Sequence, residues 1–356
     1  MSDNTMMIIQ SHKGPYHVHM NAGLPAELAA GKGRFLIDRN VAALHADRLA
    51  APLASGRVVL IDATEENKSI EAMPATIDRL MATGVKRDHV LVAVGGGIVQ
   101  DITCFLAANM FRGMDWVFAP TTLLAQCDSC IGSKSSINAG GAKNLLGTFT
   151  PPRQVFIDPG YLDTLDQREI RSGVGEMLKV HAIAGPDHFA RIAAAFDALF
   201  TDRAVLARFI RRSLEVKQGY IERDEFDRGI RNIFNYGHTT GHAIEAATHF
   251  GIPHGIAVAM GMDLANHIAR RSGVAPEAVF RSMHGTLRRA YAGYEELEVP
   301  LEDFFAAAAK DKKNRSGDQI AFILPDAQAN IVKHPLAVTD SLRAAVAEFF
   351  AEERKN

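Results

Sequence analysis

The chain has 356 residues, of which 47% are hydrophobic and 22% charged, and these values are ordinary for a globular protein with a large core. A net charge of −2 without a basic run argues against a nucleic-acid partner, and no apolar run approaches the ~18 residues that a membrane span needs. Three scattered cysteines form no disulfide framework, and residues 1–4 lack the charged-then-apolar pattern of a secretory leader. We therefore expect a cytoplasmic protein with no nucleic-acid or membrane partner, built from about two domains.

The first part of the chain alternates short apolar strands with helices. The predicted strands are residues 35–37, 57–61, 89–94 and 116–120, and the predicted helices are 42–53, 69–83 and 98–109. This alternation indicates a parallel sheet with helices on both faces, which binds ligands at the carboxyl ends of its strands. We expect residues 1–164 to be a Rossmann-like α/β domain that binds a nucleotide.

After Thr164 the strand signal fades and helical periodicity takes over. The predicted helices are residues 169–183, 188–199, 204–221, 238–247, 256–271 and 275–291, followed by one late strand at 319–324. The expected fold is therefore an α/β domain with a parallel sheet, joined to a mostly α-helical domain at 165–356. A cleft between two such domains is the usual place for an active site.

A triple glycine, Gly95-Gly96-Gly97, stands where the third predicted strand meets a helix. Glycines there let the backbone approach a pyrophosphate at the positive end of the helix, although a plain glycine-rich turn is the alternative. Asp101 lies one helical turn further on, and Asp38 ends the first strand, where an acid can bind ribose hydroxyls. Glu65 and Lys68 follow the second strand, and on their own they would indicate only a solvated loop.

A polar stretch follows the fourth strand. Residues 120–134 and the pair Lys143-Asn144 combine small side chains with spaced lysines, a composition that suits a phosphate-binding cradle. Solvated surface lysines are the alternative. Cys127 and Cys130 form a CxxC, but a thiol function is disfavoured because the surrounding pattern is not thioredoxin-like.

Three histidines are the most informative feature of the second half. His238 and His242 are four residues apart on a predicted helix and share one face, and His254 follows a proline and can approach from a neighbouring turn. A bare pair of this kind is common by chance. Converging imidazoles are nevertheless ligands for Zn²⁺ or a similar cation, and no cysteine lies near to close a structural site, so we predict an open, catalytic metal site.

Glu176 supplies the carboxylate that these histidines lack. It lies on an apolar helix and shares a face with Lys179, so a simple salt bridge between the two is the alternative. With His238 and His254 it would give three protein ligands and leave room for substrate oxygens.

Taken together, the motifs GGGxxxD, PTTLLAQxDS, KN-LLG-F, GxxExLK, NxGHTxGHAIE, HGxAVAxGM and DKK resemble those of the 3-dehydroquinate synthase and sugar phosphate cyclase superfamily. The resemblance covers residues 35–325. It implies an NAD-binding domain, a metal domain and a homodimer. It also implies a lyase of the shikimate pathway that converts 3-deoxy-D-arabino-heptulosonate 7-phosphate to 3-dehydroquinate and phosphate. The implied cofactors are NAD, recycled in each turnover, and Zn²⁺, with Co²⁺ as the alternative.

The resemblance also implies roles for individual residues. The implied metal ligands are Glu176, His238 and His254. The implied NAD-binding residues are Asp38, Glu65, Lys68, Gly95, Gly96, Gly97, Asp101, Thr121, Thr122, Lys143 and Thr164. Around the phosphate it places Lys134, Asn144, Asn235 and His242, and at the ring hydroxyls Asp128 and Lys179. It pairs Lys217 with Arg231 at the substrate carboxylate. It adds Lys143 and one of Lys312 and Lys313 to the active site, and Arg112 across the dimer interface.

Three motifs depart from the family pattern next to these residues. The family's GGKT is Gly132-Ser133-Lys134-Ser135 here, its GKN is Ala142-Lys143-Asn144, and its HGE is His254-Gly255-Ile256. They suggest a divergent branch and leave two alternatives open. One is a cyclase for another sugar phosphate, such as sedoheptulose 7-phosphate or glucose 6-phosphate. The other is an NAD- and metal-dependent alcohol dehydrogenase with net hydride transfer.

Overall fold

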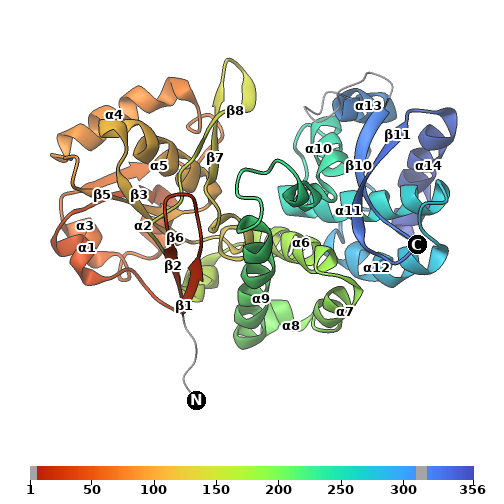
Figure 1. The fold of residues 1–356 in the computed structure, drawn as a ribbon, viewed down its shortest axis with the longest axis horizontal. Helices are drawn as coiled ribbons and strands as arrows, with labels where there is room; N and C mark the ends of the chain where they lie inside the picture. The colour runs from red at the N-terminus through yellow and green to blue at the C-terminus, as the bar shows by residue number, and fades with distance from the viewer. Residues whose placement is uncertain (1–5, 310–318) are drawn as a thin grey trace. The chain divides into compact units, whose positions relative to one another are not determined.

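The computed structural model describes residues 6–309 and 319–356, and the chain divides into two compact units (Figure 1). The first unit consists of Met1–Leu165 and Lys217–Asp227, and the second of Asp166–Val216 and Arg228–Asn356. The segment Lys217–Asp227 thus groups with the α/β unit, although it lies far beyond residue 164. Within the described residues, no helix is long and apolar enough to cross a membrane.

A seven-stranded sheet forms the centre of the first unit. Its order is β1 (Met6–Ile9), β2 (Tyr16–Met20), β9 (Gln154–Ile157), β6 (Asp115–Pro120), β5 (Val90–Gly95), β3 (Gly33–Asp38) and β4 (Val58–Ile61). All neighbours are parallel except β1 and β2. The predicted α/β fold with a parallel sheet is confirmed. Buried β-branched and aromatic side chains such as Phe35, Val92 and Val117 explain the continuous apolar strands.

Two of the three helices predicted in the first unit are shorter or divided in the structure, whereas the third is present over the whole of its predicted range. The observed helices are α1 (Ala26–Ala30), α2 (Arg39–Leu44), α3 (Ala50–Ala54), α4 (Met73–Ala82), α5 (Gly97–Asn109), and 3₁₀ turns at Ile70–Ala72, Met110–Arg112 and Pro159–Thr164. The single helix predicted at 42–53 is wrong. Pro52 has no N–H to donate and is tolerated only in a first turn, so a new helix begins at Ala50.

A β-hairpin occupies part of the predicted phosphate cradle. After a π-helical turn at Ala125–Ser129, β7 (Lys134–Ala139) pairs antiparallel with β8 (Ala142–Phe149). Gly140 and Gly141 form the connection with φ values of +56° and +78°. A two-residue hairpin turn with both φ positive favours glycine, so this hairpin was readable from the sequence and we missed it.

The second unit is mostly helical, as predicted. It contains α6 (Gln167–Ile183), α7 (Pro186–Ala194), α8 (Ala198–Thr201), α9 (Arg203–Ile221, whose residues from Lys217 belong to the first unit), a 3₁₀ helix at Ile230–Asn235, α10 (His238–Ala247), α11 (His254–Arg271), α12 (Glu277–Ala290), α13 (Leu301–Ala309), α14 (Asp340–Ala351) and a 3₁₀ turn at Glu353–Lys355. The predicted late strand is β10 (Gln319–Pro325), and it pairs with β11 (Ile331–Ala337), which was not predicted. Residues Gly255–Ala269 of α11 are all buried, which places this helix at the centre of the unit.

Candidate metal and nucleotide sites

Glycines bring the three helices of the candidate metal site into backbone contact. A Cβ atom on Gly255 of α11 would overlap the carbonyl of Ser172 in α6, and one on Gly175 would overlap the carbonyl of Gly255. A Cβ on Gly261 would likewise overlap the backbone at Gly237, which precedes α10. Such close approach is possible only without side chains. It places residues next to these glycines, on three different helices, within reach of one another.

The predicted metal ligands converge at these crossings. Glu176 Oε1 lies 3.6 Å from His238 Nε2 and 3.3 Å from His254 Nε2. His238, His242 and His254 each offer a ring nitrogen, and these three atoms all lie within 4.8 Å of one another. The site thus combines one buried carboxylate with imidazoles, of which His242 is the exposed member. This donor set fits an open zinc site.

Hydrogen bonds to the other ring nitrogen orient His238 and His254, the two histidines beside Glu176. His254 Nδ1 lies 3.2 and 3.3 Å from the carboxylate oxygens of Glu245, and His238 Nδ1 lies 3.3 Å from the carbonyl oxygen of Tyr236. With Nδ1 as the donor, each ring keeps its Nε2 lone pair for a cation. Glu245 was not predicted, although it ends the motif GHAIE, where an acid beside three histidines was a usable signal.

Lys179 and the histidines set the charge of Glu176. The Lys179 Nζ lies 2.6 Å from Glu176 Oε2, and both residues are buried, so the predicted salt bridge is present as well. Burial raises the pKa of Glu176, but Lys179 and the two histidines outweigh it and hold that pKa well below its usual value. Burial lowers the pKa of His254, but the carboxylates of Glu176 and Glu245 raise it to about 10. The carboxylates thus favour positive charge on His254, whereas burial and Lys179 hold the pKa of His238 well below its usual value.

The 3₁₀ helix Ile230–Asn235 carries further predicted residues beside this cluster. Arg231 is buried, and Asn235 Nδ2 donates to the carbonyl oxygen of Asn232 at 2.8 Å. The Lys179 ammonium lies 5.8 Å from the centre of the Phe234 ring. The second unit therefore supplies carboxylate, imidazole, ammonium, guanidinium and amide groups from α6, the 3₁₀ helix, α10 and α11.

In the first unit, the triple glycine begins α5 as predicted. Gly95 ends β5, Gly96 is the extended N-cap residue and Gly97 is the first helical residue, with no side chain capping the helix. A Cβ on Gly95 would press on Val99, whereas one on Gly97 would meet nothing within 4 Å. The N-terminus of α5 thus has no side-chain cap and has open space beside Gly97, an arrangement that suits a pyrophosphate.

Other predicted NAD-binding residues near this point also make structural hydrogen bonds. Asp38 Oδ1 accepts from the Asn40 amide at 2.8 Å and caps α2, while the Thr121 amide donates to the Gly95 carbonyl at 2.9 Å. Thr122 Oγ1 accepts from the Ala125 amide at 3.2 Å, and Thr164 Oγ1 lies 2.7 Å from His45 Nε2. These residues shape the turns that follow the strands, whatever else they bind.

Lys68 joins residues that the sequence assigned to two different ligands. Its buried Nζ donates to Asn144 Oδ1 at 3.0 Å and to Asp101 Oδ2 at 3.4 Å, and it lies 3.6 Å from Glu65 Oε1. The solvated loop considered for Lys68 is therefore wrong. Burial raises the pKa of Asp101 to about 6 against the opposing effect of Lys68. Ser136, not predicted, donates through Oγ to Asn144 Oδ1 at 3.0 Å.

Two predicted lysines have carboxylate partners within the first unit. Lys217 Nζ lies 2.6 Å from Asp128 Oδ1 and donates to the Asp128 carbonyl oxygen, also at 2.6 Å. Lys134 Nζ donates to Asp227 Oδ2 at 2.7 Å. Asp128 and Lys217 were assigned to different parts of the substrate, and here they bind each other.

Two further predicted residues, both in the first unit, have exposed side chains. Lys143 is exposed on β8, and Arg112 is exposed in the 3₁₀ turn after α5 with a φ of +65°. Lys312 and Lys313 lie outside the described residues.

Known proteins resemble this chain over most of its length, both in structure and in sequence. The structure of ValA, a 2-epi-5-epi-valiolone synthase from Streptomyces hygroscopicus subsp. jinggangensis with NAD⁺ and Zn²⁺ bound, aligns with a TM-score of 0.81 and 29% identity, covering 94% of this chain and 97% of the other. A 3-dehydroquinate synthase from Alkaliphilus metalliredigens is 34% identical over 91% of this chain and 94% of its own length. One from Thermoanaerobacter sp. is 36% identical over 83% of this chain and 85% of its own length.

The family follows from matches along most of the chain. The N-terminal 3-dehydroquinate synthase family model matches residues 58–172, and the C-terminal model matches residues 173–314. The chain belongs to the 3-dehydroquinate synthase family, and the resemblance drawn from its motifs is confirmed.

Proposed function

We propose that this protein is a lyase that converts 3-deoxy-D-arabino-heptulosonate 7-phosphate to 3-dehydroquinate and phosphate. The observation that carries the proposal is the convergence of Glu176, His238 and His254 in a chain 34% identical to a curated 3-dehydroquinate synthase over 91% of its length. Metal ligands alone would also suit a dehydrogenase. The family membership of the chain favours the lyase.

The proposed metal is a divalent cation, Zn²⁺ or Co²⁺, held by these three residues and oriented through Glu245. When bound, the cation lowers the pKa of the hydroxyls that it contacts, and NAD accepts and returns a hydride. The Lys179 ammonium, 2.6 Å from Glu176, is placed to stabilise negative charge that develops on the substrate beside the site. His242 and Asn235 supply hydrogen-bonding groups for the departing phosphate.

The proposed NAD site lies in the first unit. The open N-terminus of α5 would hold the pyrophosphate, and Asp38 at the end of β3 would bind ribose hydroxyls.

Asn144 and Lys134 are the proposed binders of the substrate phosphate in this unit. Asn144 uses its Oδ1 to accept from Lys68 and Ser136, so its Nδ2 is the atom suited to donate to a phosphate oxygen. Lys134 would add a point charge there, in competition with Asp227.

The second candidate is a cyclase that acts on a sugar phosphate without a carboxylate, and the environment of Lys217 favours it. The charge of Lys217 is matched by Asp128 at 2.6 Å, so Lys217 has a partner other than a substrate carboxylate. Ile256, fully buried, stands where the family has a glutamate, and the 29% identical ValA is named for a different product. We retain the heptulosonate as the first candidate because Arg231 offers a buried guanidinium, whose planar fork suits a carboxylate.

The domain roles and the assembly are also proposals. We assign NAD binding to residues 1–164 and metal and substrate binding to residues 165–356. We further propose a cytoplasmic homodimer in which the exposed Arg112 reaches the partner's active site. Its exposed position supports this role, and a monomer in analytical ultracentrifugation would contradict it.

A substrate panel separates the candidates. The protein, loaded with NAD⁺ and zinc, is incubated with the heptulosonate phosphate, sedoheptulose 7-phosphate or glucose 6-phosphate, while released phosphate and NADH absorbance are followed. Phosphate release from the heptulosonate alone, without accumulation of NADH, is expected. If only a sugar phosphate without a carboxylate were turned over, the second candidate would replace the first as the proposed function. Stoichiometric NADH would instead indicate a dehydrogenase.

A further inference from the structure

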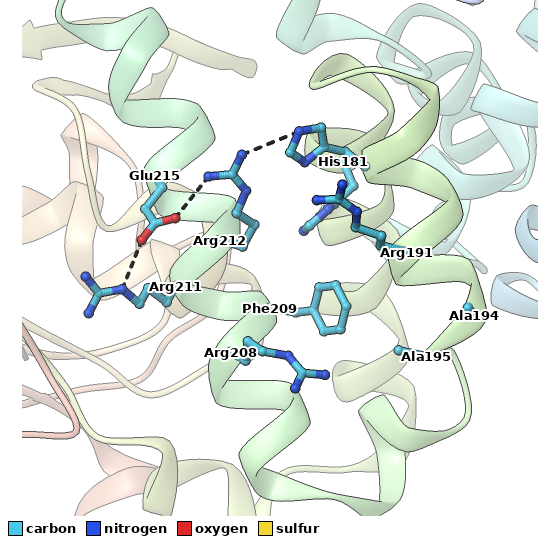
Figure 2. Close-up of a pocket in the computed structure, with 10 residues that line it drawn as sticks. His181, Arg191, Ala194, Ala195, Arg208, Phe209, Arg211, Arg212 and Glu215 are labelled. Atoms are coloured by element: carbon cyan, nitrogen blue, oxygen red, sulfur yellow. Dashed lines mark hydrogen bonds and ion pairs between the residues drawn. The ribbon is translucent and has the colours of Figure 1, made fainter. Parts of the chain in front are cut away.

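A pocket lined by α6, α7 and α9 in the second unit lies outside the proposed catalytic residues (Figure 2). Its volume is about 620 Å³, within the roughly 300–1,000 Å³ range of small-molecule sites. None of its ten lining residues belongs to the metal cluster or to the residues assigned to substrate and NAD. The lining residues are His181, His188, Arg191, Ala194, Ala195, Arg208, Phe209, Arg211, Arg212 and Glu215.

Positive charge dominates the lining. Four arginines line the pocket, and among its lining residues, all of which the structure describes, Glu215 is the only acid. Glu215 accepts from Arg211 Nε at 2.9 Å and from Arg212 Nη1 at 3.0 Å, and Figure 2 shows it joined to both side chains. One carboxylate therefore holds two guanidinium groups in place and leaves an excess of three positive charges around the pocket.

His181 is a buried polar group of the pocket lining. It is 1% exposed, neither ring nitrogen makes a well-aligned hydrogen bond within the described residues, and weaker contacts with the carbonyl groups of His188 and Phe209 favour its protonated form. A buried polar atom without a well-aligned hydrogen bond destabilises the fold, so such groups commonly serve a ligand or water. The neighbouring His188 is disfavoured in its protonated form, because burial and then the positive charges of Arg212 and Arg191 lower its pKa.

The walls between these polar groups are apolar. Phe209 is 7% exposed, and the small side chains of Ala194 and Ala195 leave space beside it. Guanidinium groups match the two oxygens of a carboxylate, and a flat apolar body can pack on an aromatic ring. We propose that this pocket binds a small organic carboxylate with a planar apolar body, which the arginines hold by its anionic end.

Calorimetric titration of the full-length protein, loaded with NAD⁺ and zinc, tests the proposal. The probe is 3-phenylpropanoate, and the neutral alcohol 3-phenylpropanol and inorganic phosphate are its comparisons. Saturable binding of the carboxylate at one site is expected, with at least tenfold weaker binding of the alcohol and of phosphate. Equal binding of the alcohol, or phosphate binding that is as tight as that of the carboxylate and is lost in Ala194→Phe, would overturn the assigned ligand class. Absence of saturable carboxylate binding would overturn the site.

Variants locate the binding in the pocket. Arg208→Gln should lower the affinity for the carboxylate about tenfold, since it removes one charged hydrogen-bond donor. Ala194→Phe should abolish binding by filling the space without removing a charge. Arg281→Gln, which removes an exposed arginine of α12 outside the pocket, is the matched control and should bind as the wild type does. Unchanged affinity in Ala194→Phe, with its thermal unfolding intact, would place the ligand elsewhere and refute the inference.

Discussion

Replacing Gly255 with alanine tests whether glycine crossings hold the proposed metal site together. The added Cβ would overlap the Ser172 carbonyl of α6, so α6 and α11 must move apart. Overpacking of this kind costs about 1–3 kcal/mol, and loss of the 2.9 Å hydrogen bond from the Gly255 amide to Ser172 Oγ adds about 1 kcal/mol. The gain in helix propensity returns about 1 kcal/mol, so the expected net destabilisation is about 1–3 kcal/mol.

The same movement should weaken the metal more than it weakens the fold. His254 precedes Gly255 and Glu176 follows Gly175, so separating the helices separates two proposed ligands whose atoms must lie about 2 Å from a zinc ion. We expect zinc affinity to fall at least tenfold, measured by competition with a chromophoric chelator, alongside urea unfolding of the zinc-free protein.

Gly285→Ala is the matched control. Gly285 lies inside α12, and a Cβ there would meet nothing within 4 Å. This variant should be about 0.5–1 kcal/mol more stable than the wild type and should bind zinc normally. If Gly255→Ala matched Gly285→Ala in both stability and affinity, the reasoning from backbone contact would be refuted.

Three other perturbations follow from described contacts. Glu245→Ala should lower zinc affinity about 10–100-fold by releasing His254 Nδ1, with Glu245→Gln in between, and equal affinities in chelator competition would count against this orienting contact. Lys217→Met should destabilise the protein by about 3–5 kcal/mol in urea unfolding, because it leaves Asp128 buried without its cation; a loss under 1 kcal/mol would contradict a buried pair. His267 is fully buried with a pKa lowered to about 4, so it stabilises the fold above its ordinary pKa of 6.5, and this stability is lost as pH falls toward 4. The contribution of His267 to this loss at pH 5 should be about 2 kcal/mol, so the drop in stability between pH 7.5 and 5.0 should be about 2 kcal/mol smaller in His267→Gln, as unfolding at both pH values would show.

The sequence predicted the elements whose side chains have one clear environment. Strands β3 to β6 are short runs of buried apolar residues, and α5 and α10 begin at glycines that mark a change of direction. Strand β1 was missed because Met6–Ile9 is only four residues long, and β2 was missed because Val18 is its only β-branched residue, although its alternation with histidines is itself a strand signal. Strand β11 was missed because it contains Pro335, and proline within a run counts against a strand.

The candidate site divides along the same line. His238 and His242 share a helix, so their spacing alone predicted a common face. The pairs Lys217–Asp128 and Lys68–Asn144 join residues that are 89 and 76 positions apart, and only the folded chain brings them together. The residue types alone identified these side chains as candidates for binding a ligand, but they could not predict which lysine would pair with which acidic or amide side chain.

Lys68 sets a limit on how this protein can be altered. One ammonium serves Asp101 near the proposed cofactor site and Asn144 on the hairpin proposed to meet the phosphate. A substitution that adjusts either neighbour changes the charge balance felt by the other. Affinity for the cofactor and affinity for the phosphorylated substrate therefore cannot be tuned one at a time at this position, and a change of substrate has to be achieved with residues that do not share this lysine.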